Sequence, residues 1–314
     1  MISIHKPSIT VVIPVYNNQD TLFHIVDRLK PVLQKTASKY EIIFINDGSK
    51  DFSWLKIVEL AEFHSIVRGI NLMRNYGQHN ALLCGIRSAR YDIIVTMDDD
   101  LQNPPEELPK MLERLSEGYD VVYGTPQQEQ HGFWRDIASR ITKLALQSTM
   151  GVDNARNVSA YRAFRTQLRD SFSHYQGPFI SIDVLLTWGT TNFSSIPVRF
   201  EPRRIGESNY TFWMLINHAL NMVTGFSLFP LQLASMVGFI FTLFGFIVLA
   251  FVVVRYLIQG GSVPGFSFLA SVVAIFSGAQ LFALGIIGEY LGRIFNRSME
   301  KPPYIVRSFT EIKE

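Results

Sequence analysis

Residues 91–105 read YDIIVTMDDDLQNPP, an apolar run that ends in three consecutive aspartates. The β-branched residues of Tyr91–Met97 predict a buried strand, and Pro105–Glu117 has the pattern of a helix. Three adjacent carboxylates repel one another, so a strand end carries them at a cost unless a cation or hydrogen-bond donors offset their charge. The stretch therefore predicts a strand whose carboxyl end forms an acidic site.

The same alternation of strand and helix patterns fills the first 124 residues. Apolar runs of strand length are Ile9–Val15, Tyr40–Asn46, Val67–Leu72 and Asp120–Gly124, and helical patterns cover residues 21–33, a stretch ending at His64, and 80–89. Strands that are apolar throughout and alternate with helices are typical of a parallel-rich sheet covered on both faces. We therefore expect an α/β fold.

Polar residues gather where these strands end. Ligands of open α/β sheets bind beyond the carboxyl ends of the strands, and Tyr16–Asn18, Asp47–Ser49 and the aspartates occupy those ends. In an extended chain Asp98 and Asp100 would point to one side, with Gln102 continuing that spacing. Oxygen ligands of this kind suit Mg²⁺ or Mn²⁺ shared with substrate phosphates. Two alternatives stay open: a solvated acidic turn, and an Asp-Gly-Ser sequence that is only a turn.

The C-terminal half has two long stretches without Asp, Glu, Lys or Arg, at residues 208–254 and 257–288. A bilayer core about 30 Å thick needs roughly 20 apolar helical residues, and Leu231–Val254 and Ser267–Gly288 both provide them. The stretch between them is short and contains glycines and Pro264, as expected for a turn. We expect a transmembrane hairpin; the alternative is a helical hairpin buried inside a soluble fold.

Charge and flanking sequence predict the orientation of this hairpin. The basic residues Arg293, Arg297, Lys301 and Arg307 follow the second span, which favours a cytoplasmic tail. Met1–Ser8 is polar and unlike a signal peptide, so we expect the N-terminal domain and both termini in the cytoplasm of a multi-pass protein of the inner or plasma membrane. Tyr210–Phe226 has an amphipathic pattern typical of an interfacial helix, or else begins the first span early.

Composition excludes several other classes of site. The 29 basic and 27 acidic residues give a net charge of +2, so no basic field indicates nucleic acid. The single cysteine, Cys84, excludes an internal disulfide. Glycine-rich phosphate loops and the G-x-S-x-G elbow are absent from the sequence, and the seven histidines lack metal-ligand spacing.

Six motifs together resemble one family, the family-2 inverting glycosyltransferases of the polyprenyl-phosphate branch. The motifs are Val11–Asn17, Asn46–Ser49 with Asp51, Arg74–Gly77, Met97–Pro105, Ser159–Arg165 and Arg203–Tyr210. The chain looks closest to bactoprenol glucosyltransferases and, more distantly, to dolichol-phosphate mannose synthases. The resemblance implies a nucleotide-diphospho-sugar transferase (GT-A) fold with interfacial helices and a C-terminal two-helix transmembrane hairpin.

The resemblance also implies residue roles. The residues implied to bind the nucleotide are Pro14, Tyr16, Asn17, Asp47, Asp98 and Asp99. Those implied to bind Mg²⁺ or Mn²⁺ are Asp100 and Gln102. Those implied to bind the acceptor phosphate are Arg203, Arg204, Ser208 and Tyr210. The catalytic set is Asp98, Asp100, Asn157 and Arg203. Position 157 departs from the family pattern, since close relatives often carry Asp there. Asn157 therefore implies either a weaker natural enzyme or an engineered replacement.

These observations predict four regions and one reaction. The regions are a cytoplasmic glycosyltransferase domain (1–203), an interfacial segment (204–230), the hairpin (231–292, with spans 231–254 and 267–288) and a cytoplasmic tail (293–314). The expected reaction transfers glucose from UDP-glucose to undecaprenyl phosphate with inversion. The protein is expected to lie in a lipid bilayer, and it could form a homo-oligomer. The alternatives are a mannosyltransferase that uses GDP-mannose, a different acceptor, and a non-catalytic membrane scaffold.

Overall fold

The computed structural model describes residues 6–126, 158–177, 180–201, 229–259 and 265–310. The chain forms two compact units, one made of residues 1–216 and 301–314 and the other of residues 217–300. The first unit therefore contains chain from both sides of the second. The boundaries differ from the four predicted regions chiefly because residues after 300 belong to the first unit.

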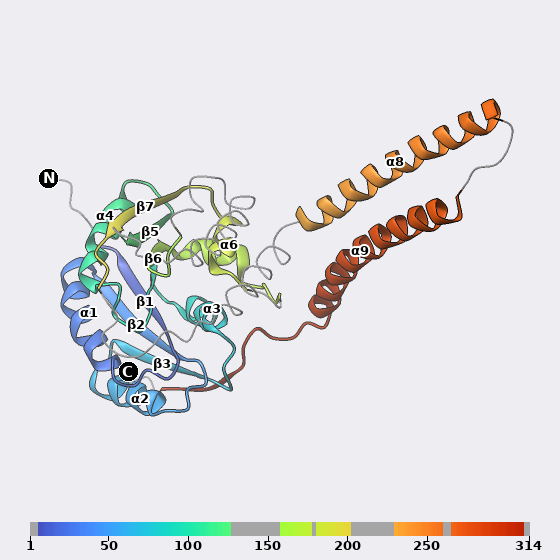
Figure 1. Ribbon diagram of the computed structural model, residues 1–314. Coiled ribbons are helices and arrows are strands. Elements are labelled where there is room, and N and C mark those ends of the chain that lie inside the picture. Colours follow the sequence, from blue (N-terminus) through green and yellow to red (C-terminus); the bar gives the residue numbers. More distant parts are fainter. Residues whose placement is uncertain (1–5, 127–157, 178–179, 202–228, 260–264, 311–314) are drawn as a thin grey trace. The chain divides into compact units, whose positions relative to one another are not determined.

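The first unit is built on a mixed eight-stranded sheet in the order β7-β5-β6-β4-β1-β2-β3-β8 (Figure 1). Its elements in chain order are β1 (Ser8–Val15), α1 (Leu22–Thr36), β2 (Lys39–Asn46), α2 (Ser53–Phe63), β3 (Val67–Leu72), α3 (Gln78–Ser88), β4 (Ile93–Thr96), η1 (Pro105–Glu107), α4 (Leu108–Ser116), β5 (Val121–Pro126), β6 (Arg162–Arg165), η3 (Thr166–Phe172), α6 (Ile182–Thr187), β7 (Phe193–Val198) and β8 (Val306–Phe309). The α/β fold with a parallel-rich sheet is confirmed, and so is every strand and helix predicted for residues 9–124.

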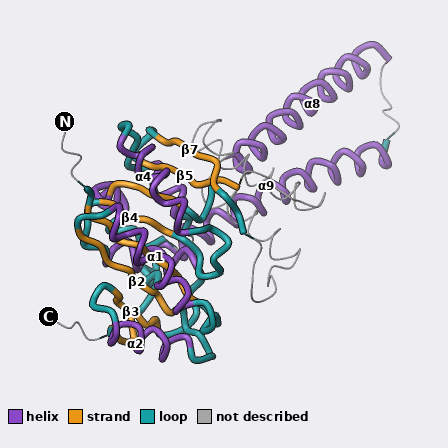
Figure 2. The backbone as a smooth tube through the Cα atoms, turned by 90° about the vertical axis from the view of Figure 1, so that its left-hand side faces the viewer, coloured by secondary structure: helices purple, strands orange, loops and turns teal. Residues whose placement is uncertain are grey.

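Helices cover both faces of this sheet, as Figures 1 and 2 show. Alternate residues of β1, from Ile9 to Val15, join α1, α2 and α4 in one buried apolar cluster. On the other face α3 packs so closely that a Cβ added to Gly85 would lie 2.3 Å from Val12. Side chains of β1 point alternately to the two helical layers, which explains why every residue from Ile9 to Val15 is buried.

The second half of the sheet differs from a simple parallel arrangement. β1 pairs in parallel with β2 and β4, and β2 with β3, but β6 lies antiparallel between β4 and β5. The predicted strand at Asp120–Gly124 is therefore not the neighbour of β4. The sequence of β6, RAFR, is only four residues long and carries an arginine at each end, so it has no run that predicts a buried strand.

The tail after residue 300 supplies the edge strand β8, which pairs antiparallel with β3. Thr310, directly after β8, bonds Gly69 twice: its N–H donates to the Gly69 carbonyl at 3.0 Å, and its Oγ1 accepts from the Gly69 N–H at 2.9 Å. A Cβ at position 69 would lie 2.4 Å from Ile57 and 2.8 Å from Thr310. Glycine therefore lets α2 and the tail both approach β3.

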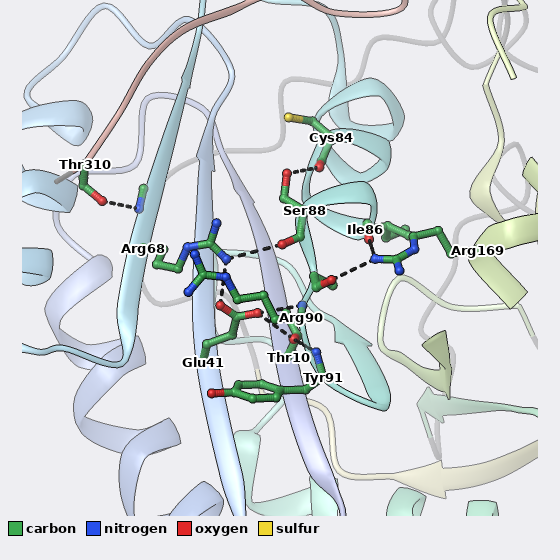
Figure 3. A network of polar contacts seen from close by, with 12 residues as sticks. Thr10, Glu41, Arg68, Cys84, Ile86, Ser88, Arg90, Tyr91, Arg169 and Thr310 are labelled. Carbon is green, nitrogen blue, oxygen red and sulfur yellow. Dashed lines mark hydrogen bonds and ion pairs between the residues drawn. The ribbon is translucent and has the colours of Figure 1, made fainter. Parts of the chain in front are cut away.

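A polar network fixes the end of the sheet where β1, β2 and β3 begin (Figure 3). The buried carboxylate of Glu41 accepts hydrogen bonds from Thr10 Oγ1 at 2.9 Å, Arg68 Nη1 at 2.8 Å and the Arg90 N–H at 2.9 Å. Thr10 and Glu41 are directly opposite in the β1–β2 pairing. Five residues separate Thr10 from the end of β1, about 17 Å, so this network holds the strands in register from a distance.

The second unit contains the two helices α8 (Phe229–Gln259) and α9 (Phe266–Ser298). They pack against each other around Phe276, whose ring lies 5.8 Å from that of Phe241 and 6.5 Å from that of Phe244, centroid to centroid. A Cβ at Gly245 would approach the Phe276 ring to 3.0 Å. The small residue at this position therefore allows the aromatic contact.

Both helices are long and apolar enough to cross a membrane. The candidate spans are Leu231–Ile258, with a mean hydropathy of 2.9, and Ile275–Ser298, with 1.3, and 0% of either span is buried in the protein. A helical hairpin inside a soluble fold would be mostly buried, so the exposure of both helices favours the transmembrane hairpin over that alternative. Large apolar side chains are exposed along both helices, among them Phe239, Leu257 and Leu281, which suits a hydrocarbon environment rather than water.

Candidate active site

The predicted site residues of the first unit lie where β1, β2 and β4 end. These strands are parallel, with Val15 opposite Asn46 and Val12 opposite Thr96, so their carboxyl ends meet at one edge of the sheet. The loops that follow carry Tyr16 and Asn17, Asp47, and the three aspartates. The structure thus gathers the described part of the predicted site at one edge.

Asn17 joins the loops after β1 and β2. It adopts a left-handed backbone conformation with φ of 52°, which asparagine tolerates better than most residues. Its N–H donates to Ser49 Oγ at 3.0 Å, and its Oδ1 accepts from the Lys50 N–H at 2.7 Å. Pro14 lies in the buried part of β1, which ends at Val15, and Tyr16 after it is 42% exposed. A flat aromatic ring is thereby presented at the edge of the site.

Asp47 holds a third loop against the first two. Its side chain is 3% exposed, and its two carboxylate oxygens accept from the Tyr76 N–H at 2.7 Å and the Gly77 N–H at 2.8 Å. Burial raises the pKa of Asp47, and those two N–H donors oppose the shift. Asp47 is thus an anchor of the loop between β3 and α3. Its direct contact with a nucleotide stays a prediction.

Gly48 lets the same two loops touch. Its φ is +68°, and a Cβ there would lie 2.4 Å from the backbone of Arg74 and of Asn75. Any side chain would meet main-chain atoms that cannot rotate away. The Asp-Gly-Ser sequence is therefore a turn with a packing role beside the predicted donor-binding one.

The aspartates form a turn rather than an extension of the strand. β4 ends at Thr96, and Leu101 has a φ of 59°. Asp100 is 8% exposed, and its Oδ1 accepts from the Gln102 N–H at 3.0 Å. The prediction that Asp98 and Asp100 point to one side assumed an extended chain. That assumption is wrong, because residues 99 and 100 form a turn.

Three partners from outside the turn support it. Gln78, at the start of α3, donates from Nε2 to Asp98 Oδ1 at 2.6 Å. The Asp99 carbonyl accepts from Asn18 Nδ2 at 2.9 Å and Thr21 Oγ1 at 2.7 Å. The alternative of a freely solvated acidic turn does not fit these contacts, because side chains from two other elements hold it.

The electrostatics of this turn favour a cation. Burial, reinforced by the carboxylates of Asp98 and Asp100, raises the pKa of Asp99 to about 7. Among the described residues, groups of three or more His, Cys, Asp or Glu side chains able to hold a metal are absent. Asp100 and Gln102 could supply two oxygen ligands of a hard divalent cation, with phosphates of a bound substrate supplying others. The residues present therefore fit a metal shared with a phosphorylated ligand, not a closed protein cage.

The chain returns to this turn after β7. The Glu201 N–H donates to the Gln102 carbonyl at 2.8 Å. Arg28 of α1 pairs with both Glu201, at 3.1 Å, and Glu106, at 2.7 Å. Arg199 donates to Glu107 at 2.6 Å. These bonds fix residues 199–201 beside the acidic turn.

The remaining predicted residues lie outside the described part of the chain. They are Asn157, Arg203, Arg204, Ser208 and Tyr210, together with residues 204–228 of the predicted interfacial segment 204–230, whose last two residues begin α8.

Sequence reasoning missed other residues that the structure adds to this edge. A pocket of about 340 Å³ is lined by Arg74–Gly77, Asn80, Pro302 and Pro303. Gln78 and the two prolines carry no local signal, because their neighbours in the fold are distant in sequence. The run Arg74–Gly77, polar residues directly after a buried strand, was the one available clue, and it is among the motifs that carry the family resemblance.

Comparison with known proteins agrees with this architecture. The family model described as glycosyl transferase family 2 matches residues 10–176. An undecaprenyl-phosphate 4-deoxy-4-formamido-L-arabinose transferase from Enterobacter sp. (strain 638) is 36% identical over 308 residues, covering 97% of this chain and 94% of that protein.

Solved structures show the same fold at lower identity. Glucosyl-3-phosphoglycerate synthase from Mycobacterium tuberculosis, in complex with Mn²⁺, UDP and glucosyl-3-phosphoglycerate, has a TM-score of 0.52 and 18% identity, over 69% of this chain and 78% of that one. Its complex with Mn²⁺, UDP-glucose and phosphoglyceric acid gives a TM-score of 0.53 and 18% identity, over 70% and 79%. With the GT-A fold in place, and with a family match over more than half its length, this chain belongs to glycosyl transferase family 2.

Proposed function

We propose that this protein transfers a sugar from a nucleotide-sugar donor to the phosphate of a polyprenyl lipid at a membrane surface. The observation that carries the proposal is that the undecaprenyl-phosphate sugar transferase matches 97% of the chain, hairpin included. A relative that shared only the sheet domain would support the use of a nucleotide-sugar donor but would say nothing of the lipid acceptor. The apolar hairpin supplies a reason for the lipid acceptor as well.

The acceptor needs little activation. A phosphate monoester has a second pKa of about 6, so it is largely a dianionic nucleophile near neutral pH. In-line attack on the anomeric carbon breaks the bond to the donor diphosphate and inverts that centre. The chain must then stabilise the leaving diphosphate and bring two anions together.

The acidic turn and the residues after Glu201 would share these tasks. Asp100 and Gln102 would hold Mg²⁺ or Mn²⁺, which when bound offsets the charge of the donor diphosphate. Asp98 and Asp99 would line the nucleotide side of the site, with Pro14, Tyr16, Asn17 and Asp47. Arg203 and Arg204, which follow Glu201 in the sequence, would meet the acceptor phosphate. Ser208, Tyr210 and Asn157 complete the proposed acceptor side.

The hairpin would keep the lipid in place during the reaction. Each CH₂ group moved from lipid into water costs about 0.8 kcal/mol, so a polyprenyl chain stays in the bilayer while its phosphate reacts. The sequence on both sides of the hairpin belongs to one folded unit, in which β3 and β8 are hydrogen-bonded. This pairing supports a hairpin that crosses the membrane twice, with the sheet domain and the tail on one side, and the basic residues after the second span support the cytoplasmic side.

The identity of the donor is the most specific part of the proposal. UDP-glucose leads on the resemblance to bactoprenol glucosyltransferases, and the relative from Enterobacter makes 4-deoxy-4-formamido-L-arabinose a second candidate sugar. GDP-mannose is the third candidate donor.

The test is transfer of radiolabelled sugar to undecaprenyl phosphate by the full chain in detergent. We expect an organic-soluble glycolipid with one of these donors, formed with Mn²⁺ or Mg²⁺ and lost with EDTA. Transfer that persists in EDTA would overturn the metal assignment only. A folded protein that turns over none of the donors, with either metal, would favour a membrane scaffold.

A further inference from the structure

The pocket beside Asp47 has walls from two distant parts of the chain. One wall is the loop Arg74–Gly77, whose Tyr76 and Gly77 N–H groups are bonded to Asp47. The other is Pro302 and Pro303, which follow the hairpin in sequence. Both walls belong to the sheet-bearing unit.

We propose that Pro302 and Pro303 form a specificity-determining wall for the nucleoside of the donor; the inference rests on the proposed function. The acidic turn follows β4, and the pocket follows β3. In the order β4-β1-β2-β3 these ends are three strand spacings apart, about 14 Å. A donor with its diphosphate at the acidic turn therefore directs its nucleoside along the strand ends toward this pocket.

The lining suits a flat, polar-edged group. The Arg74 guanidinium lies 4.4 Å from the centroid of the Tyr76 ring, so the two make a stacked cationic and aromatic surface. Asn75 and Asn80 add amide groups that can donate and accept hydrogen bonds. The proline rings close the opposite side with rigid apolar surface. A nucleobase has this combination of flat faces and hydrogen-bonding edges.

The proline wall is fixed to the strand that carries the facing loop. Met73, the first residue after β3, donates its N–H to the Ile305 carbonyl at 2.9 Å, and its own carbonyl accepts from Arg307 Nη2 at 2.9 Å. Arg87 of α3 lies over the Tyr304 ring, 5.9 Å from its centroid. These contacts on both sides of Met73 and on Tyr304 hold the proline wall against β3 and α3. A wall that selects a nucleoside by shape must be held in a fixed position in this way.

The first experiment measures nucleotide binding by the full chain in detergent with Mn²⁺. Titration calorimetry with UDP and GDP would compare the wild type, Pro303→Trp and the control Ile305→Ala. Ile305 belongs to the same segment, is 49% exposed and lies outside the pocket lining. We expect at least tenfold weaker binding to Pro303→Trp and unchanged binding to Ile305→Ala. The KM for donor should rise in parallel while the KM for undecaprenyl phosphate stays constant.

A second measurement uses the wild type and so does not depend on how the variant folds. Photolabelling with 5-azido-UDP-glucose, followed by peptide mapping, should mark the peptide that contains Pro302 and Pro303. A folded Pro303→Trp variant with wild-type affinity, or labelling confined to other peptides, would contradict the proposed role of Pro302 and Pro303. If the wild type binds neither nucleotide and takes no label, the proposed function itself fails, and the inference with it.

Discussion

At the scale of single residues, the acidic turn is where charge is concentrated and where substitution should matter most. Asp98 and Asp99 each have a hydrogen-bond partner outside the turn, while Asp100 bonds the main chain of the turn itself. Removal of the Asp98 carboxylate would also break its hydrogen bond from Gln78 of α3, whereas the hydrogen bond from the Gln102 N–H to Asp100 lies within the turn. This separates a chemical role from a structural one.

Asp100→Ala should lower the rate of sugar transfer by about a hundredfold or more, because the proposed metal loses its carboxylate. The measurement is initial rate at saturating Mn²⁺, with the unfolding temperature recorded in parallel. Asp27→Ala removes an exposed aspartate of α1 that has no proposed role in the site, and it should leave the rate unchanged. Full activity in the Asp100 variant would refute the metal assignment.

Gln78→Leu should lower kcat/KM about tenfold, close to 1.4 kcal/mol in transition-state stabilisation. Leucine keeps much of the volume but cannot donate to Asp98, and hydrogen bonds to charged groups contribute about 1.5–3 kcal/mol. Gln167→Leu places the same change at an exposed position among residues that line the far end of β4. An equal loss in both variants would show that Gln78 acts through stability rather than through Asp98.

At the scale of elements, β8 is the least expected part of the sheet. Its sequence, VRSF, is four residues long and includes Arg307 and Ser308, so it gives no strand signal by itself. It becomes a strand because β3 offers an edge and because Gly69 lets Thr310 approach. Such a strand is defined by its partner rather than by its own composition.

Thr310→Val should reduce the free energy of unfolding by about 1–3 kcal/mol, since the buried Gly69 N–H loses its acceptor and finds no replacement. Valine has nearly the same shape, so packing is preserved. Thermal unfolding of the purified protein measures the change, and Thr310→Ser, which restores the hydroxyl, is the matched control. Equal stability of the valine and serine variants would contradict the role assigned to this bond.

The contrast between β1 and β8 explains how far the sequence could predict the fold. β1, β2 and β3 are six to eight residues long, and most of their residues are buried. Their existence and their parallel pairing follow from the apolar residues that they contain and from the helices between them. The order of β4, β6 and β5 could not be predicted, because β6 is short and polar. The site divides in the same way. The aspartates are visible as a run, whereas Gln78 and Pro302 meet the site only through contacts made by folding.

At the scale of the whole molecule, the pairing of β3 with β8 constrains membrane topology. One folded unit contains residues from before and after the hairpin, so these residues would share one side of a bilayer that the hairpin spans. The orientation expected from the basic residues near Arg293 and Arg297 is cytoplasmic. The two arguments are independent, since one comes from strand pairing and the other from charge.

Cysteine labelling in membrane vesicles tests this topology. Lys35→Cys and Lys301→Cys should react with an impermeant maleimide only in inverted vesicles, and Ser262→Cys, between the spans, only in right-side-out ones. The natural Cys84 is buried and serves as an internal background. Labelling of positions 35 and 301 from opposite sides would be incompatible with the sheet described above.

The position of β8 in the sequence also sets an order of events during synthesis. The ribosome adds about 5–20 residues per second, and it makes both hairpin helices before residues 306–309 exist. Until then the outer edge of β3 has no partner, and an open strand edge is a template for association with other chains. Completion of the sheet domain thus waits on the synthesis of the hairpin. A chain arrested before its hairpin is finished cannot close its own sheet, so incomplete products carry an exposed edge that cellular quality control can recognise.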